Sequence, residues 1–142
     1  MAEETPIPDL NMPVETVCYI IMKAKEFDVK VQEDDLNEGS DTADDAERDI
    51  LADYAGDLTL EELREAIHDL NEDHQVTLIA LSWLGRGDFD ISEWSDAMAL
   101  ADERHRGDSV NYLVGTPLLG DYLEEGLAAF GESCSEMAMG HL

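Results

Sequence analysis

Residues 76–84 read Val76-Thr77-Leu78-Ile79-Ala80-Leu81-Ser82-Trp83-Leu84, and this stretch decides the fold class. At helical spacing its apolar side chains point in every direction, which is typical of a helix that is buried on all sides. Asn71 precedes it as an N-cap, and Gly85 and Gly87 follow it as stop signals. Because the stretch is shorter than the ~18 apolar residues of a membrane span, we predict a central core helix over about 75–84.

Amphipathic helices are predicted on both sides of this segment, and period-two alternation typical of strands is absent. Before the central helix we expect a helix from Pro13 to about Phe27, a helix over about 42–55, and a helix that Thr59 and Glu62 begin with a capping box. After it we expect a helix that begins at Asp90 or Ser92 and ends at Gly107, followed by a short turn of helix over 108–115. A last helix follows, which Thr116 caps, Pro117 opens and Gly131 closes. The sequence therefore predicts an all-α fold, with five or six helices around the central one.

The chain has 142 residues, which suits one domain. We expect an extended tail over 1–12, a helical domain over 13–131 and a C-terminal tail over 132–142. Within the domain, the acid-rich residues at about 31–41 are predicted to form a mobile loop, because charge runs of one sign repel and Gly39 breaks regular structure.

The charge is strongly one-sided, with 35 acidic residues against 8 basic ones and a formal net charge of −27. Such a surface repels nucleic acid phosphates and anionic membranes, and it favours basic proteins, polyamines or divalent cations as counter-ions. The alternative interpretation is solubility, or adaptation to a salty cytoplasm in which self-repulsion is screened. We therefore expect no nucleic acid partner and no membrane partner.

The two cysteines give no sign of a metal or redox motif, since no CxxC pair is present. Cys18 lies at helical spacing with Val14, Val17 and Ile21, which predicts a small buried apolar residue. Cys134 falls in the expected C-terminal tail. Because the N-terminus lacks the basic segment of a signal peptide, the sequence predicts a cytoplasmic protein.

Metal and catalytic motifs fail at their diagnostic positions. Asp88, Asp90 and Ser92 match the first, third and fifth positions of a calcium loop, but Glu93 stands where glycine is needed and Ala99 where a bidentate Glu is needed. Helix capping explains these residues without a metal.

A carboxylate-bridged metal site would need an inward Glu-x-x-His pair, and Glu65 with His68 falls off the apolar stripe of its helix. His105 falls on the apolar side of its own helix, which predicts a hydrogen-bonded boundary histidine. There is no nucleophile elbow and no phosphate-binding glycine loop. We predict no cofactor and no metal, and an enzymatic activity is not favoured.

One cluster stands out. Arg86 follows the core helix, close to Asp88 and, along the sequence, to Trp83 and Trp94. The structural interpretation is an arginine that ties a helix junction to nearby carboxylates. The functional interpretation is a small pocket with an arginine anchor and indole walls. Trp83, Arg86, Asp88 and Trp94 are therefore the candidate ligand-binding residues.

Four phrases resemble an uncharacterised bacterial family, mainly alphaproteobacterial, that is defined only as a domain of unknown function. They are Val17-Cys18-Tyr19-Ile20-Ile21, Leu70-Asn71-Glu72-Asp73-x-Gln75, Leu81-x-Trp83-Leu84-Gly85-Arg86-Gly87-Asp88 and Pro117-Leu118-Leu119-Gly120-Asp121-Tyr122-Leu123-Glu124-Glu125-Gly126-Leu127. The likeness covers roughly residues 14–131 and is strongest over 59–127. The resemblance implies a helical, cytoplasmic bacterial protein and carries over no catalytic residue.

Three hypotheses for function remain open. The first is a non-enzymatic helical domain that binds a protein partner or a second copy of itself. The second is a small-ligand or metal-binding protein, or an enzyme of unrecognised type, with a pocket near Trp83, Arg86, Asp88 and Trp94. The third is an acidic mimic of nucleic acid that binds a basic protein.

Overall fold

A computed structural model describes residues 7–37 and 58–134 of the chain. In these ranges the chain is helical and contains no strand, which confirms the predicted all-α fold. The elements are α1 (Val14–Asn37), a helix over 58–68, α3 (Glu72–Arg86), the single 3-10 turn η1 (Ile91–Glu93), α4 (Trp94–His105), α5 (Ser109–Val114) and α6 (Leu119–Ala129).

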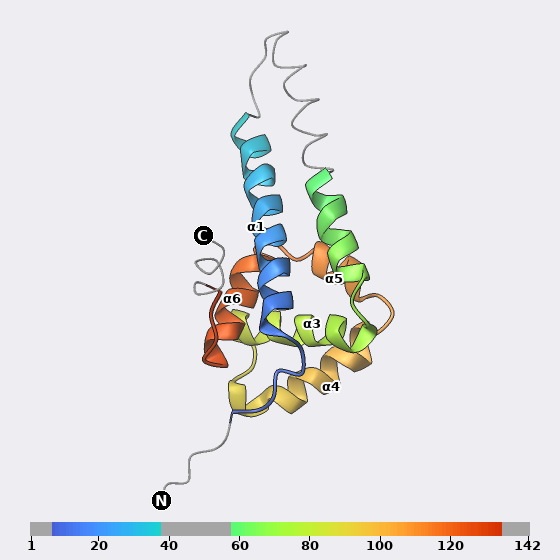
Figure 1. Cartoon of the computed structure of the whole chain (residues 1–142), viewed down its shortest axis with the longest axis vertical. Helices are drawn as coiled ribbons and strands as arrows, with labels where there is room; N and C mark the ends of the chain where they lie inside the picture. The colour runs from blue at the N-terminus through green and yellow to red at the C-terminus, as the bar shows by residue number, and fades with distance from the viewer. Residues whose placement is uncertain (1–6, 38–57, 135–142) are drawn as a thin grey trace, which may run out of the picture.

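The central helix is α3, which packs against α4, α5 and α6 (Figure 1). Every residue from Gln75 to Leu84 is buried, so the predicted core helix over 75–84 is confirmed. Its polar side chains find backbone partners inside the protein: the Thr77 hydroxyl donates to the Asp73 carbonyl at 2.9 Å, and the Gln75 amide donates to two carbonyls of the preceding turn. A helix that is buried all round is therefore not left with unsatisfied polar groups.

Glycines allow α6 to approach its neighbours closely. A Cβ atom built on Gly85 of α3 would lie 1.7 Å from the carbonyl oxygen of Tyr122, and one on Gly126 of α6 would lie 2.5 Å from the carbonyl oxygen of Leu81. On the side of α6 that faces α1, a Cβ atom built on Gly120 would lie 3.1 Å from the carbonyl oxygen of Ile21. These three positions therefore require glycine, because any side chain would collide with the neighbouring helix.

The prediction of a loop at about 31–41 is wrong for residues 31–37, because these residues continue α1 to Asn37. Acidic residues lower helix stability only slightly, and no glycine or proline interrupts the chain before Gly39. Residues 38–41, and the helix expected over about 42–55, lie outside the described residues.

Some helix ends follow the predicted capping residues and others do not. Asn71 caps α3 as predicted, since its side chain accepts from the His74 N–H at 2.8 Å. Leu58 is already helical, so Thr59 is not the expected N-cap. Thr116 is not a cap either, because its hydroxyl donates to the Tyr112 carbonyl and α6 begins only after Leu118.

The glycines that end helices are confirmed by backbone geometry. Gly87 adopts φ 93° and Gly131 adopts φ 79°, both in the left-handed region that glycine enters without strain. The Asp88 N–H donates back to the Trp83 carbonyl at 3.0 Å, which closes α3 with the hydrogen bonds of a Schellman motif.

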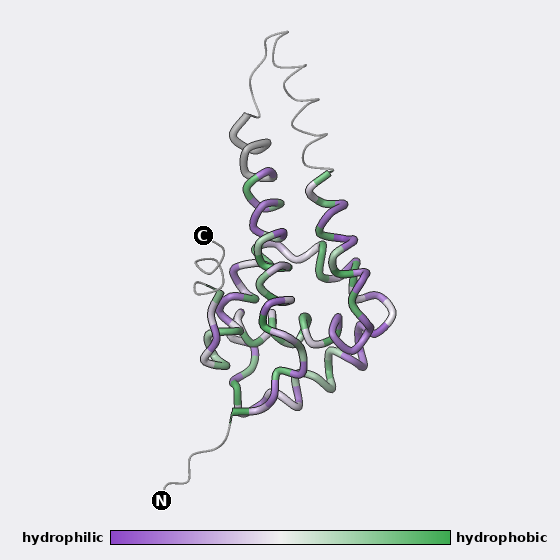
Figure 2. Tube along the Cα trace, viewed as in Figure 1, coloured by the Kyte–Doolittle hydropathy of each residue, from purple (hydrophilic) through white to green (hydrophobic). Residues whose placement is uncertain are grey.

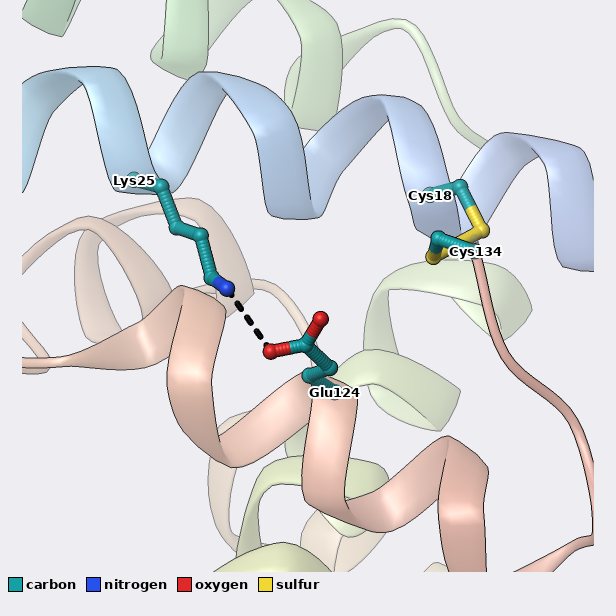
Figure 3. Close-up of a disulfide and its surroundings, with 4 residues drawn as sticks. All are labelled: Cys18, Lys25, Glu124 and Cys134. Atoms are coloured by element: carbon teal, nitrogen blue, oxygen red, sulfur yellow. Dashed lines mark hydrogen bonds and ion pairs between the residues drawn. A yellow bond between two sulfur atoms is a disulfide. The ribbon is translucent and has the colours of Figure 1, made fainter. Parts of the chain in front are cut away.

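Both predicted tails are partly incorporated in the domain. Residues 7–13 are not helical, but Leu10 and Met12 are buried in the core. The chain after α6 returns along α1 and forms a disulfide between Cys134 and Cys18, with Cα atoms 5.6 Å apart (Figure 3). The interpretation of Cys18 as a small apolar core residue is therefore wrong, because its partner lies 116 residues away and only the packing of α6 on α1 brings it close.

Within the described ranges, no helix has the length and apolarity that crossing a bilayer requires.

Candidate functional site

Trp83, at the end of α3, lies in a group of aromatic side chains. Its indole is 5% exposed and has ring centroids of Phe89 and His105 at 5.9 Å and of Tyr112 at 6.4 Å. The indole N–H donates to the Tyr112 hydroxyl at 2.9 Å, so its one polar group is satisfied. Tyr112 in turn stacks on His105, with ring centroids 4.0 Å apart.

Arg86 and Asp88 border this aromatic group. The Arg86 Nε and Nη2 atoms donate to one oxygen of Asp88, at 2.9 and 2.6 Å, across the left-handed turn at Gly87. The Asp88 carboxylate raises the pKa of Arg86, and the neighbouring Tyr112 hydroxyl adds to this shift. The guanidinium is therefore engaged within the protein, as the structural interpretation of Arg86 expects.

Trp94 lies in a different group. Its ring, at the start of α4, packs edge-on against Phe130 with centroids 4.9 Å apart. Its indole N–H is buried and has no hydrogen-bond partner. The structure thus brings together Trp83, Arg86 and Asp88, and it places Trp94 against the end of α6.

Two members of the aromatic group, Tyr112 and Phe89, were not among the predicted site residues. Phe89 follows Asp88 directly, so its proximity could have been inferred from the sequence. Tyr112 comes from α5, and no sequence signal links α5 to the end of α3. His105, predicted as a hydrogen-bonded boundary residue, is half-buried and stacks on Tyr112.

The residues considered as metal ligands lie apart from one another, at the start of η1 and on the 58–68 helix. Asp90 is the N-cap of η1, and its backbone N–H donates to the Glu93 carboxylate at 2.8 Å, as in a capping box. Glu65 and His68 are both exposed. Over the described part of the chain, no three His, Cys, Asp or Glu side chains are grouped so that they could hold a metal ion.

A surface hollow of about 720 Å³ lies between the 58–68 helix and the start of α5. Arg64 and Glu65 line it from one side, and Asp108 and Asn111 from the other. The Arg64 guanidinium donates to the Asn111 side chain at 2.8 Å, so the basic group in this hollow is also engaged within the protein.

A second feature is the outward face of α1. The helix buries Val17, Ile20, Ile21 and Ala24 on its inner side. On the opposite side lie five residues that are four, three, four and three positions apart, and we call this row the α1 seam: Glu15, Tyr19, Met22, Glu26 and Val29.

The apolar residues of the α1 seam are open to solvent. Tyr19, Met22 and Val29 are 49%, 48% and 52% exposed. Figure 2 shows hydrophobic and hydrophilic residues following one another along α1. A hollow of about 490 Å³ adjoins Tyr19, and one of about 470 Å³ adjoins Met22 and Val29.

The lysines of α1 are paired with acids of neighbouring elements. Lys23 donates to Glu62 of the 58–68 helix at 3.1 Å and lies 5.7 Å from the Tyr19 ring centroid. Lys25 donates to Glu124 of α6 at 2.7 Å (Figure 3). These hydrogen bonds raise the pKa of each lysine above its ordinary value.

The fold and these surfaces define a small all-helical domain that is assembled around a buried helix, with glycines where α6 packs closely on α1 and α3. Residues 60–132 match the family model described as protein of unknown function, DUF3775, so the chain belongs to that family. The match includes Gly85, Gly120 and Gly126. Comparison with curated proteins and with solved structures gives no significant match.

Proposed function

We propose that this chain is a non-enzymatic protein-interaction domain whose contact surface is the α1 seam. The observation that carries the proposal is the exposure of Tyr19, Met22 and Val29 on the side of α1 that faces away from the core. Single exposed apolar residues need no explanation, but a row of three on one helix face is a feature of interaction surfaces. Tyrosine and methionine are also enriched where proteins contact each other.

The surroundings support the same interpretation. Leu58, on the neighbouring helix, is 49% exposed, and Thr59 beside it lines the same hollow as Met22 and Val29. Both helices therefore carry an exposed large apolar side chain, and both contribute to the lining of this hollow. A partner that covers them would gain roughly 25 cal/mol for each Å² of apolar surface removed from water.

The small-ligand alternative has less support. A pocket with an arginine anchor needs a guanidinium that can turn to the ligand, and Arg86 donates two hydrogen bonds to Asp88. Trp94, its second predicted wall, packs on Phe130 instead. No observation at the end of α3 favours a ligand over a structural junction.

Site-specific photo-crosslinking tests the proposal. A benzophenone amino acid replaces Met22 in one variant and Ile7 in a matched control, since Ile7 is 57% exposed and lies outside the α1 seam. In cells of the native organism, we expect a discrete protein adduct from position 22 that position 7 does not form. The adduct's mass separates a second copy of the chain from another protein. Equal labelling from both positions, or none from position 22, would refute the proposal.

The bacterial, mainly alphaproteobacterial origin of the family and a cytoplasmic location remain parts of this proposal. Disulfides are rare in a reducing cytosol, where those that occur are mostly redox-sensing or catalytic. Alkylation of free thiols in intact cells would report whether Cys18 and Cys134 are paired there. Fully paired cysteines in every growth condition would argue against the cytoplasmic location.

A further inference from the structure

We infer that the occupant of the α1 seam is a basic amphipathic helix of another protein. This inference rests on the proposed function and names the chemistry of the partner. It follows from the spacing of the seam, from the acidic side chains along and beside it, and from the net charge of the chain.

The spacing of the α1 seam indicates a helical partner. Steps of four and three residues are the repeat of a coiled-coil seam, in which one helix packs along another. At 3.6 residues per turn the five side chains fall within roughly 80° of one another, and they extend over roughly 21 Å of helix. A partner helix of about four turns matches that length, and apolar side chains at the same spacing would contact Tyr19, Met22 and Val29.

The charges along the α1 seam indicate a basic partner. Glu15 and Glu26 occupy two of the five seam positions, so they would face the partner directly. Glu62, Glu65 and Asp69 line the hollow beside Tyr19 and continue the negative surface on the neighbouring helix.

The lysines of α1 offset part of this negative surface. Lys23 pairs with Glu62 and Glu26, and Lys25 pairs with Glu124 and Asp121. Lys30 lines the hollow beside Met22 and Val29. The negative charge beside Tyr19 is therefore carried mainly by Glu15, Glu65 and Asp69. With 35 acidic residues in the chain against 8 basic ones, long-range steering also favours a positive partner.

The same glutamates disfavour a second copy of this chain. Two α1 seams packed in parallel would place Glu26 against its counterpart, and in either orientation two copies that each carry a net charge of −27 repel one another. A lysine or arginine on a different helix turns this repulsion into attraction. Glu15 and Glu26 therefore favour a basic helix over a parallel second copy.

The test uses three designed helical peptides of equal length, labelled for fluorescence anisotropy and titrated with the full chain at 0.15 M salt. The first has apolar residues facing Tyr19, Met22 and Val29 and lysine facing Glu15 and Glu26. The second has glutamate in place of those two lysines. The third is a scrambled version of the first, with the same charge and no apolar face.

We expect the lysine peptide to bind at least about tenfold more tightly than either other peptide, because only it combines the apolar face with complementary charge. A Met22→Ser, Val29→Ser double variant is expected to weaken its binding by at least about tenfold, whereas the control Ile7→Ser is not. Glu26→Lys is expected to reduce the preference for the lysine peptide over the glutamate peptide, because only Glu15 still favours lysine. Circular dichroism verifies that each exposed-site variant is folded.

Each other outcome overturns the inference in a distinguishable way. Equal binding of the scrambled peptide means that net charge alone drives association. Equal binding of the glutamate peptide means a partner without charge selection, and this leaves the proposed function intact. Concentration-dependent dimerisation that Met22→Ser and Val29→Ser abolish means that the occupant is a second copy. Absence of binding by all three peptides rejects the basic helix, and photo-crosslinking from position 22 then decides the proposed function separately.

Discussion

Removal of the Cys18–Cys134 disulfide should cost a large part of the stability of this domain. The bond joins residues 116 positions apart and so restricts most of the unfolded chain. The chain-entropy relation for a loop of this size gives about 4.8 kcal/mol at 25 °C, and natural disulfides usually contribute about 2–4 kcal/mol. Domains of this size are stable by about 5–15 kcal/mol in total. We therefore expect a loss of about 3–5 kcal/mol.

The native structure should nevertheless persist without the bond. α6 remains against α1 through the close approach at Gly120 and the Lys25–Glu124 ion pair, and α3 holds it from the other side. The effect should therefore be seen in the free energy of unfolding rather than in helix content. At about 2–4 °C per kcal/mol, the melting temperature should fall by roughly 10 °C.

Urea unfolding followed by circular dichroism measures this effect. Three samples are compared: the oxidised wild type, the wild type in excess dithiol reductant, and a Cys18→Ser, Cys134→Ser double variant. The last two should have the same midpoint, and the reductant should leave the double variant unchanged. An unfolding free energy that differs by less than about 1 kcal/mol between the oxidised wild type and the double variant would refute the reasoning.

Three further predictions concern packing, the aromatic group and pH. Gly126→Ala should destabilise the fold by about 1–3 kcal/mol, because the new methyl group would lie 2.5 Å from the Leu81 carbonyl oxygen; thermal melting checks this against Gly115→Ala, whose methyl group would meet nothing closer than 3.3 Å. Tyr112→Phe should cost about 1 kcal/mol in urea unfolding, because the Trp83 indole N–H loses its acceptor, and a stability equal to wild type would contradict the importance of that bond. Burial, and secondarily Asp121, raises the pKa of Asp28. The folded protein therefore holds the Asp28 proton more tightly than the unfolded chain does, and the contribution of Asp28 to stability falls as the pH rises through its folded-state pKa. Asp28→Asn should consequently stabilise the protein at pH 7 but not near pH 3. Unfolding curves recorded at both pH values check this, and an equal shift of the two midpoints would argue against it.

The candidate site was predictable only where its residues are local in sequence. Trp83, Arg86 and Asp88 lie within one helix end, and the stop signal at Gly87 brings them together through short-range hydrogen bonds. Trp94 seemed equally near, but η1 and the start of α4 carry it to Phe130. Tyr112 completes the aromatic group from α5, and only helix packing determines that contact.

The α1 seam shows the same division. Its heptad spacing can be found in the sequence, but α1 also has a second apolar stripe with Val17, Ile21 and Ala24. The sequence predicts the second stripe as the buried face, and the structure confirms this for Val17, Ile21 and Ala24. Whether another helix covers the α1 seam depends on how the helices pack, and Tyr19, Met22 and Val29 remain exposed.

By itself, the sequence determined the all-helical class, the buried helix over 75–84 and the helix ends at Asn71, Gly87 and Gly131, because apolar periodicity, capping and left-handed glycines act within a few residues. The tertiary structure alone decided the Cys18–Cys134 pair, the partners of Trp83 and the exposure of the α1 seam. These features join residues from distant parts of the chain, and their proximity depends on how closely whole helices pack.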